Sequence, residues 1–133
     1  MMTIEDVKNK LKSLNKLKEL KPEEYAIENG IAYTIANQKG DMKFTQLRKF
    51  FGHIKKIESV KVKGEKDSEP IAKADLYMLM PELAYGVGRK VISKEFYEIM
   101  KICLCEGKIT TVADFKRFVD LLAAVIAYHK MSK

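Results

Sequence analysis

The sequence predicts an all-α protein, a compact bundle of five to six antiparallel helices. Apolar residues recur at steps of three and four along almost the whole chain, which is the spacing of one helix face. Helix-capping residues precede several of these runs, and no segment alternates apolar and polar residues as a strand would. The length suits a single domain, 1–133, and the short turns between helices predict antiparallel neighbours.

Two helices are expected in the first 40 residues. Thr3 is the predicted N-cap of the first, with Asp6 three residues later completing a capping-box pattern. Aliphatic residues at helical spacing then continue to Leu20. Pro22 and two following glutamates favour the first turn of a second helix, which carries isoleucines, among them Ile27, on its apolar face and ends at Gly40-Asp41.

A third helix is expected from Thr45, its predicted cap, to about residue 57. The polar stretch 61–69 follows and is predicted to be a flexible loop of mixed basic and acidic residues. Pro70 is expected to open a fourth helix, and Pro81 to kink or restart it. The segment Gly86-Val87-Gly88 then predicts either a break or a tight crossing.

The last two helices have clear capping signals. Ser93 is expected to cap the fifth helix, which stops at Gly107. Thr111 and Asp114 form another capping-box pattern at the start of a sixth helix, which extends to about Tyr128.

The composition favours some classes of function over others. The chain has 25 basic and 18 acidic residues, a net charge of +7 that suits polyanions but is also common in ordinary helical proteins. Cys103 and Cys105 are two residues apart on a predicted helix, so they face different sides and form neither a disulfide nor a metal site. No cofactor, signal peptide or membrane span is expected, and reduced thiols suit the cytoplasm.

The third predicted helix places its cations on one face. On a helical wheel they fall within about 120° of one another, with Gly52 between them and Phe50 on the opposite side. The cations are Arg48, Lys49, Lys55 and Lys56. A phosphate backbone could lie against such a surface, although a solvated helix face is the alternative. Gly52 costs roughly 1 kcal/mol relative to Ala in a helix interior, which suggests a reason for its presence.

A second basic patch follows the glycines of the fourth helix. Gly86 and Gly88 permit close backbone approach, and Arg89 and Lys90 come directly after them. The pattern lacks the third glycine and the preceding strand of a dinucleotide-binding fingerprint. Two interpretations stay open: a glycine-mediated helix crossing with a cationic C-terminal cap, or a phosphate contact by Arg89.

No catalytic constellation is evident. His53 borders the cationic face and could contact a phosphate or a base, or simply pack its ring. Neither His53 nor His129 has a Ser, Cys or Asp in position to form a triad, and P-loop and nucleophile-elbow patterns are absent from the sequence. An enzyme using His53 or Cys103 is therefore disfavoured, and we expect a protein that is not an enzyme.

Three stretches resemble hallmarks of the small subunit of type III-A CRISPR–Cas effector complexes, the Csm small subunit. The first is FTQLRKFF at 44–51, and the second is MPELAYGVGR at 80–89. The third is FKRF at 115–118, followed by the apolar run and Tyr-His of 124–130. They occur in the family's order, whereas the N-terminal 40 residues match only as generic helices.

The resemblance implies a small, helical, non-catalytic subunit of a ribonucleoprotein interference complex. Several copies would stack beside the crRNA–target RNA duplex, bridging subunits and binding the RNA backbone without sequence preference. Arg48 and Lys49 match the basic pair of the first motif, and Arg89 matches the arginine of the second. With the wheel-derived Lys55 and Lys56 and the adjacent Lys90, they are the candidate RNA-binding residues. Partners would be crRNA, target RNA, other Csm subunits and further copies of the chain.

A different class of function remains open. The chain could be a helical protein–protein adaptor whose basic face meets acidic partners, with no nucleic-acid role. In either case the loop 61–69 could act as a hinge that lets helices exchange between copies.

Overall fold

The computed structural model describes residues 1–132, and within them the only regular structure is helical. The elements in chain order are α1 (Ile4–Ser13), η1 (Leu17–Glu19), α2 (Pro22–Tyr25), α3 (Ile31–Ala36), α4 (Phe44–Ile57), η2 (Glu58–Val62), α5 (Lys73–Tyr77), α6 (Met80–Gly88), α7 (Lys94–Cys105) and α8 (Val112–Met131). Within this range the sole β-type pairing is an isolated bridge between Pro70 and Thr111. The predicted all-α class is confirmed.

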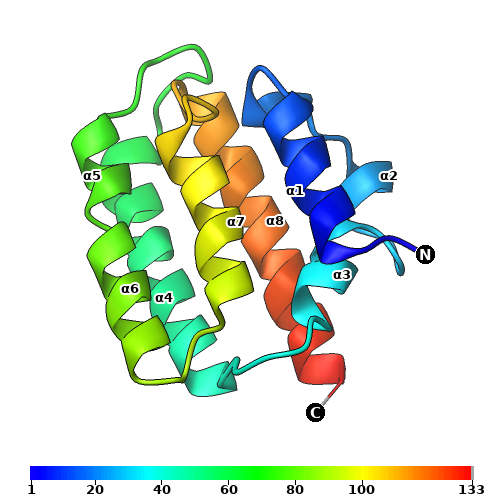
Figure 1. The fold of residues 1–133 in the computed structure, drawn as a ribbon. Helices are drawn as coiled ribbons and strands as arrows, with labels where there is room; N and C mark the ends of the chain where they lie inside the picture. Colours follow the sequence, from blue (N-terminus) through cyan, green and yellow to red (C-terminus); the bar gives the residue numbers. More distant parts are fainter. Residues whose placement is uncertain (133) are drawn as a thin grey trace.

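The helices form two layers (Figure 1). One layer holds α1, α7 and the α5–α6 pair, and behind it lie α3, α8 and α4. From α4 onward the chain alternates direction, running along α4, back along α5–α6, forward along α7 and back along α8 (Figure 1). This is the antiparallel arrangement that the short connections predicted.

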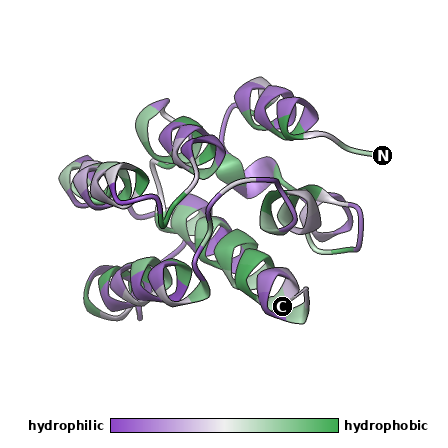
Figure 2. Ribbon diagram, turned by 60° about the horizontal axis from the view of Figure 1, so that its bottom comes forward, coloured by the Kyte–Doolittle hydropathy of each residue, from purple (hydrophilic) through white to green (hydrophobic). Residues whose placement is uncertain are grey.

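The core lies between the layers and is rich in phenylalanine. Figure 2 shows α8, which ends near the C-terminus, passing through the middle of the bundle with a largely hydrophobic ribbon. Four phenylalanines are fully buried, namely Phe50, Phe96, Phe115 and Phe118. Phe50 of α4 meets Phe96 of α7 edge to face, with 6.0 Å between ring centroids. Burying each such ring stabilises the fold by about 1.5–3 kcal/mol, so these contacts hold the two layers together.

Both predicted N-terminal helices are interrupted. The first ends at Ser13 and not at Leu20, because the buried Lys108 ammonium donates hydrogen bonds to the backbone carbonyls of Lys12 and Leu14. The predicted second helix is split into α2 and α3 at Gly30, where an added Cβ would lie 2.9 Å from the Glu24 carbonyl oxygen. Ile27, expected on an apolar face, is 57% exposed.

Two predicted helix starts are also wrong. Lys43 occupies the N-cap position of α4, and Thr45 lies inside the helix without capping it. Pro70 does not open a helix, because it bridges to Thr111, and α5 begins only at Lys73. Thr45 is an exposed residue in the first turn of α4, whereas Pro70 is used by a longer-range pairing.

The other local signals are confirmed. The Thr3 hydroxyl accepts a hydrogen bond from the Asp6 N–H at 3.1 Å, and the Asp6 carboxylate accepts from the Thr3 N–H at 2.9 Å. The Ser93 hydroxyl accepts from the Phe96 N–H at 3.0 Å at the start of α7. Pro81 lies in the first turn of α6, a new helix, as the restart interpretation required.

The predicted loop 61–69 is shorter at its start, because η2 continues to Val62, which is buried. Its far end is held on the start of α8, where the Val112 N–H donates to the Glu69 carbonyl at 2.9 Å. The Lys116 ammonium also pairs with the Asp67 carboxylate at 2.8 Å. The flexibility of this stretch stays a prediction.

Candidate nucleic-acid interface

Helix α4 carries its cations on the exposed side, as the helical wheel predicted. Arg48, Lys49, Lys55 and Lys56 are all exposed. Leu47, Phe50 and Ile54 of the same helix are buried. At Gly52 an added Cβ would meet no atom within 4 Å, so no packing inside the molecule requires a glycine there. The surface between the cations is therefore open and shallow.

The four cations of α4 differ in their electrostatic surroundings. The Lys55 ammonium lies 2.6 Å from the Glu58 carboxylate one turn later, and this ion pair partly neutralises it. Within residues 1–132, neither Arg48, Lys49 nor Lys56 forms an ion pair. These three side chains keep their full charge for an external anion.

The Phe44 ring brings the end of α8 to the same surface. The Arg48 guanidinium carbon lies 5.9 Å from the Phe44 ring centroid, and the Lys130 Nζ lies 4.9 Å from it. The ring stacks on His129, with 5.8 Å between centroids and an interplanar angle of 6°. The helical wheel of α4 could not find Lys130, which is 82 positions from Arg48. Its place within the third hallmark stretch was the available signal.

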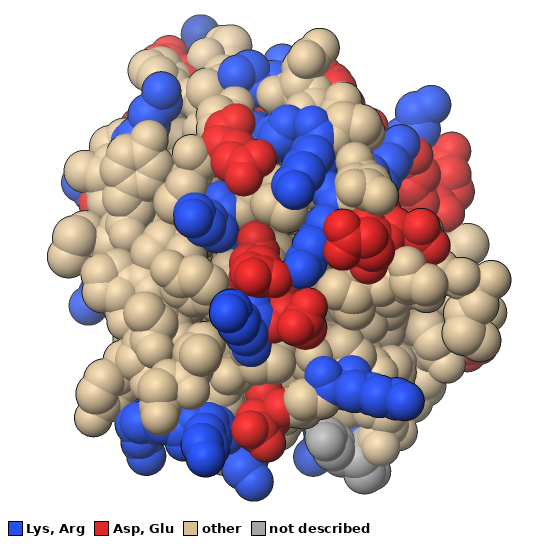
Figure 3. Space-filling model, viewed as in Figure 1, with Lys and Arg blue, Asp and Glu red and all other residues tan. Residues whose placement is uncertain are grey.

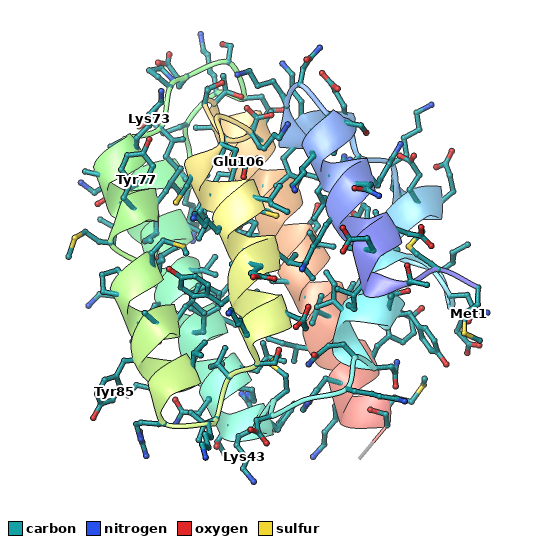
Figure 4. All side chains as sticks on the ribbon, viewed as in Figure 1. Met1, Lys43, Lys73, Tyr77, Tyr85 and Glu106 are labelled. Carbon is teal, nitrogen blue, oxygen red and sulfur yellow. The ribbon has the colours of Figure 1, made fainter. Side chains whose placement is uncertain are left out.

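The second basic patch lies at the same end of the molecule as the start of α4. The Lys43 N–H donates to the Val91 carbonyl at 3.0 Å, which ties the beginning of α4 to the turn after α6. Arg89 is the C-cap of α6, and Lys90 follows in the left-handed conformation at φ 63°. Figure 4 labels Lys43 and Tyr85 at this end, and Figure 3 shows Lys and Arg side chains gathered there.

Gly86 has a structural role in that turn. A Cβ added to Gly86 would lie 2.5 Å from Cγ1 of Ile92, because the chain folds back onto the helix after Lys90. The N–H groups of Val91 and Ile92 both donate to the Gly86 carbonyl, at 3.0 and 3.2 Å. The close approach predicted here is present, but it is made by the returning loop and not by a crossing helix. Gly88 has no atom within 4 Å of an added Cβ.

An exposed aromatic accompanies Arg89. The Arg89 guanidinium carbon lies 5.7 Å from the Tyr85 ring centroid, and Tyr85 is 70% exposed. Sequence reasoning treated Tyr85 only as part of a motif and did not select it as a site residue. Arginine next to an open aromatic ring suits contacts to phosphates and unstacked bases.

The histidine and cysteine candidates are engaged elsewhere. The Nδ1 atom of His53 lies 2.5 Å from the Glu82 carboxylate on α6, so the ring joins two helices. Cys103 is fully buried, and burial raises the pKa of its thiol to about 12. A thiol with this pKa forms almost no nucleophilic thiolate near neutral pH.

Residues 1–132 contain no helix long and apolar enough to cross a bilayer. They also contain no group of three or more His, Cys, Asp or Glu side chains that could hold a metal ion.

Comparison with known protein families gives a match over most of the chain. Residues 22–133 match the family model described as Csm2 Type III-A. The match spans α2 to α8, includes all three hallmark stretches, and leaves α1 and η1 outside. No curated protein and no solved structure matches the chain. The chain therefore belongs to the Csm2 Type III-A family and is a small subunit of a type III-A CRISPR–Cas complex.

Proposed function

We propose that this small subunit is non-catalytic and binds the backbone of crRNA and target RNA, without sequence specificity, while bridging neighbouring subunits in the cytoplasm. The observation that carries the proposal is the exposed α4 face, where Arg48, Lys49 and Lys56 have no carboxylate partner within residues 1–132. Arg48 suits a bidentate contact to phosphate, and the lysines act as point charges.

The second patch extends this surface. Arg89 and Lys90 lie beside the start of α4, so an RNA strand that follows α4 reaches them at that end. Tyr85 offers an open ring to an unstacked base next to the Arg89 contact. Lys55 contributes less, because Glu58 already neutralises part of its charge. Each copy makes few contacts, so affinity in the assembly comes mainly from repetition along the RNA.

Binding should be tested in a Csm complex reconstituted with variants of this subunit and with labelled single-stranded and duplex RNA. Arg48→Gln/Lys49→Gln removes two phosphate contacts and should weaken binding about tenfold or more, lowering the magnitude of the salt slope by roughly 1.4 for a single strand. Lys12→Gln/Lys101→Gln, which changes exposed lysines of α1 and α7, is the matched control. Equal affinities for both double variants and wild type would refute the site.

A protein-binding role has support from an adjoining apolar surface, whose hollow Lys56 of the cationic face also lines. Val60, Met78 and Tyr77 are exposed, and Val60 and Met78 line a hollow of about 350 Å³ next to His53 and Glu82. Exposed apolar side chains around a hollow are typical of protein contacts, including self-association. If binding protein through this surface is the only function, the chain is an adaptor. It should then co-purify with protein, and the absorbance of the purified material at 260 nm should not fall after RNase treatment.

A further inference from the structure

We propose that Lys130, at the end of α8, completes a phosphate-binding site with Arg48 over the Phe44 ring. The inference rests on the proposed function, since the backbone of bound RNA supplies the phosphate. It extends the RNA surface from α4 to a second helix.

The platform of this site is firmly held. The Phe44 ring lies parallel to the His129 ring, with 5.8 Å between centroids, and His129 is almost fully buried. One ring nitrogen of His129 lies 2.9 Å from the Met42 carbonyl, in the segment leading into α4. The ring that carries the two cations is thus fixed between the start of α4 and the end of α8.

Two cations share this one ring. Arg48 and Lys130 both lie within cation–π range of Phe44, which places the two charges at most about 11 Å apart. Like charges in proximity repel, and an anion bound between them removes that cost. No carboxylate within residues 1–132 forms an ion pair with either side chain, so the protein itself does not supply the anion.

The opposite end of the α4–α8 pair is a useful contrast. A hollow of about 520 Å³ there is lined by Lys55, Lys63 and Lys116, but also by Glu58. Lys55 is paired with Glu58, and Lys116 with Asp67. Two of the three cations at that end therefore already have internal counterions, whereas neither cation over Phe44 has one in the described chain. This contrast favours the Phe44 end as the phosphate site.

Lys130 also lies in the last turn of α8, where a positive charge interacts favourably with the helix dipole and stabilises the helix. A purely structural role would make its removal lower stability but leave RNA affinity alone. A phosphate contact makes its removal lower both the affinity and the salt slope, and these two effects separate the roles.

The test uses the reconstituted complex with Lys130→Gln, Lys130→Arg, Arg48→Gln and the Arg48→Gln/Lys130→Gln double variant. Lys101→Gln is the charge-matched control. Lys130→Gln should weaken RNA binding about three- to tenfold and reduce the salt slope by about 0.7, while Lys130→Arg stays near wild type. Because both side chains contact one phosphate, the double variant should lose less than the product of the single losses. Adding inorganic phosphate at matched ionic strength should not restore the RNA affinity that these variants lose.

Three results would decide against the inference in distinguishable ways. If Lys130→Gln binds like Lys101→Gln while Arg48→Gln is weakened, Lys130 makes no contact and the proposed function stands. If Lys130→Gln lowers the melting temperature without changing the salt slope, Lys130 is a helix-terminal stabiliser only. If neither Arg48→Gln nor Lys130→Gln differs from the control, the proposed RNA surface fails, and this site fails with it.

Discussion

The Asp114 carboxylate at the start of α8 accepts a hydrogen bond from the backbone N–H of Lys18, with 3.0 Å between the two atoms. The same carboxylate accepts from the N–H groups of Thr110 and Thr111, at 3.0 and 3.2 Å. Asp114 itself is fully buried. One side chain therefore begins the longest helix and also holds η1 against it, although the two segments are far apart in the sequence.

Replacing Asp114 with Asn should destabilise the protein. The amide keeps the size of the side chain but loses the charge that strengthens several hydrogen bonds, which we expect to cost about 2–3 kcal/mol of the free energy of unfolding. Urea denaturation of the isolated chain measures this. Asp120→Asn, at an exposed position of the same helix, is the control and should change stability by less than about 0.5 kcal/mol. Equal effects of the two substitutions would contradict the proposed role of Asp114.

The stability of the protein should also depend on Asp114 at acidic pH. Burial by itself raises the pKa of the Asp114 carboxyl, but hydrogen bonds from Thr110, Lys18 and Thr111 outweigh it and bring the pKa below its ordinary value of 3.8. A folded-state pKa below the unfolded one adds stability above the unfolded pKa, and this stability is lost as the pH falls through the folded pKa. Urea titrations from pH 6 to pH 2 should show a steeper loss below about pH 4 for wild type than for Asp114→Asn. Parallel curves would show that another carboxylate is responsible.

We expect Lys108 to be required for α1 to end at Ser13. Its buried ammonium donates to the Lys12 carbonyl at 2.8 Å and to the Leu14 carbonyl, and Lys108→Met leaves both acceptors without this donor. We expect a loss of about 1–3 kcal/mol in the free energy of unfolding. Hydrogen exchange should also show faster opening of η1, whose Leu17 N–H donates to the Lys108 carbonyl. Lys101→Met on the exposed face of α7 is the control, and a variant as stable as this control would count against the capping role.

Gly52→Ala should separate stability from binding. The added methyl meets nothing in the protein, and Ala is better than Gly in a helix interior, so stability should rise by about 0.5–1 kcal/mol. If an RNA backbone lies against Gly52, the affinity of the complex for RNA should fall about two- to fivefold despite the gain. Thermal melts and RNA titrations of the same preparation measure the two effects. An unchanged affinity would mean that RNA does not approach this glycine.

Gly86→Ala should have the opposite effect on stability. Its methyl would lie 2.5 Å from Cγ1 of Ile92, so the loop after α6 must shift, at a cost of about 1–3 kcal/mol. Gly88→Ala is the matched control two residues later, since its methyl meets no atom within 4 Å. Comparison of urea midpoints tests the pair. If the two variants have the same midpoint, the packing of Ile92 on Gly86 does not limit stability.

The local capping signals were predictable because the atoms involved are within one helical turn. Thr3 with Asp6, Ser93, and Thr111 with Asp114 all hydrogen-bond as their spacing indicated. The ion pair of Lys55 with Glu58 belongs to the same class and could have been anticipated from its spacing of three residues. This pair distinguishes Lys55 from the other three cations of α4, which the helical wheel alone does not separate.

The wrong helix bounds have a common physical reason. Leu17 and Leu20 are fully buried, as their spacing from Leu11 indicated, yet they lie beyond the end of α1. Apolar spacing reports which side chains are buried, and an irregular segment can bury them equally well when another part of the chain satisfies its backbone groups. Here that part is Lys108, almost a hundred residues later.

The sequence by itself determined the helical class, most helix starts from α6 onward, and the cationic face of α4, because all of these depend on neighbours within a few residues. Only the tertiary structure decided where α1 ends, that His53 meets Glu82, and that Lys130 joins Arg48 over one aromatic ring. Those pairings depend on how two distant helices lie side by side, which is set by the packing of the whole core and not by the spacing of residues along either helix.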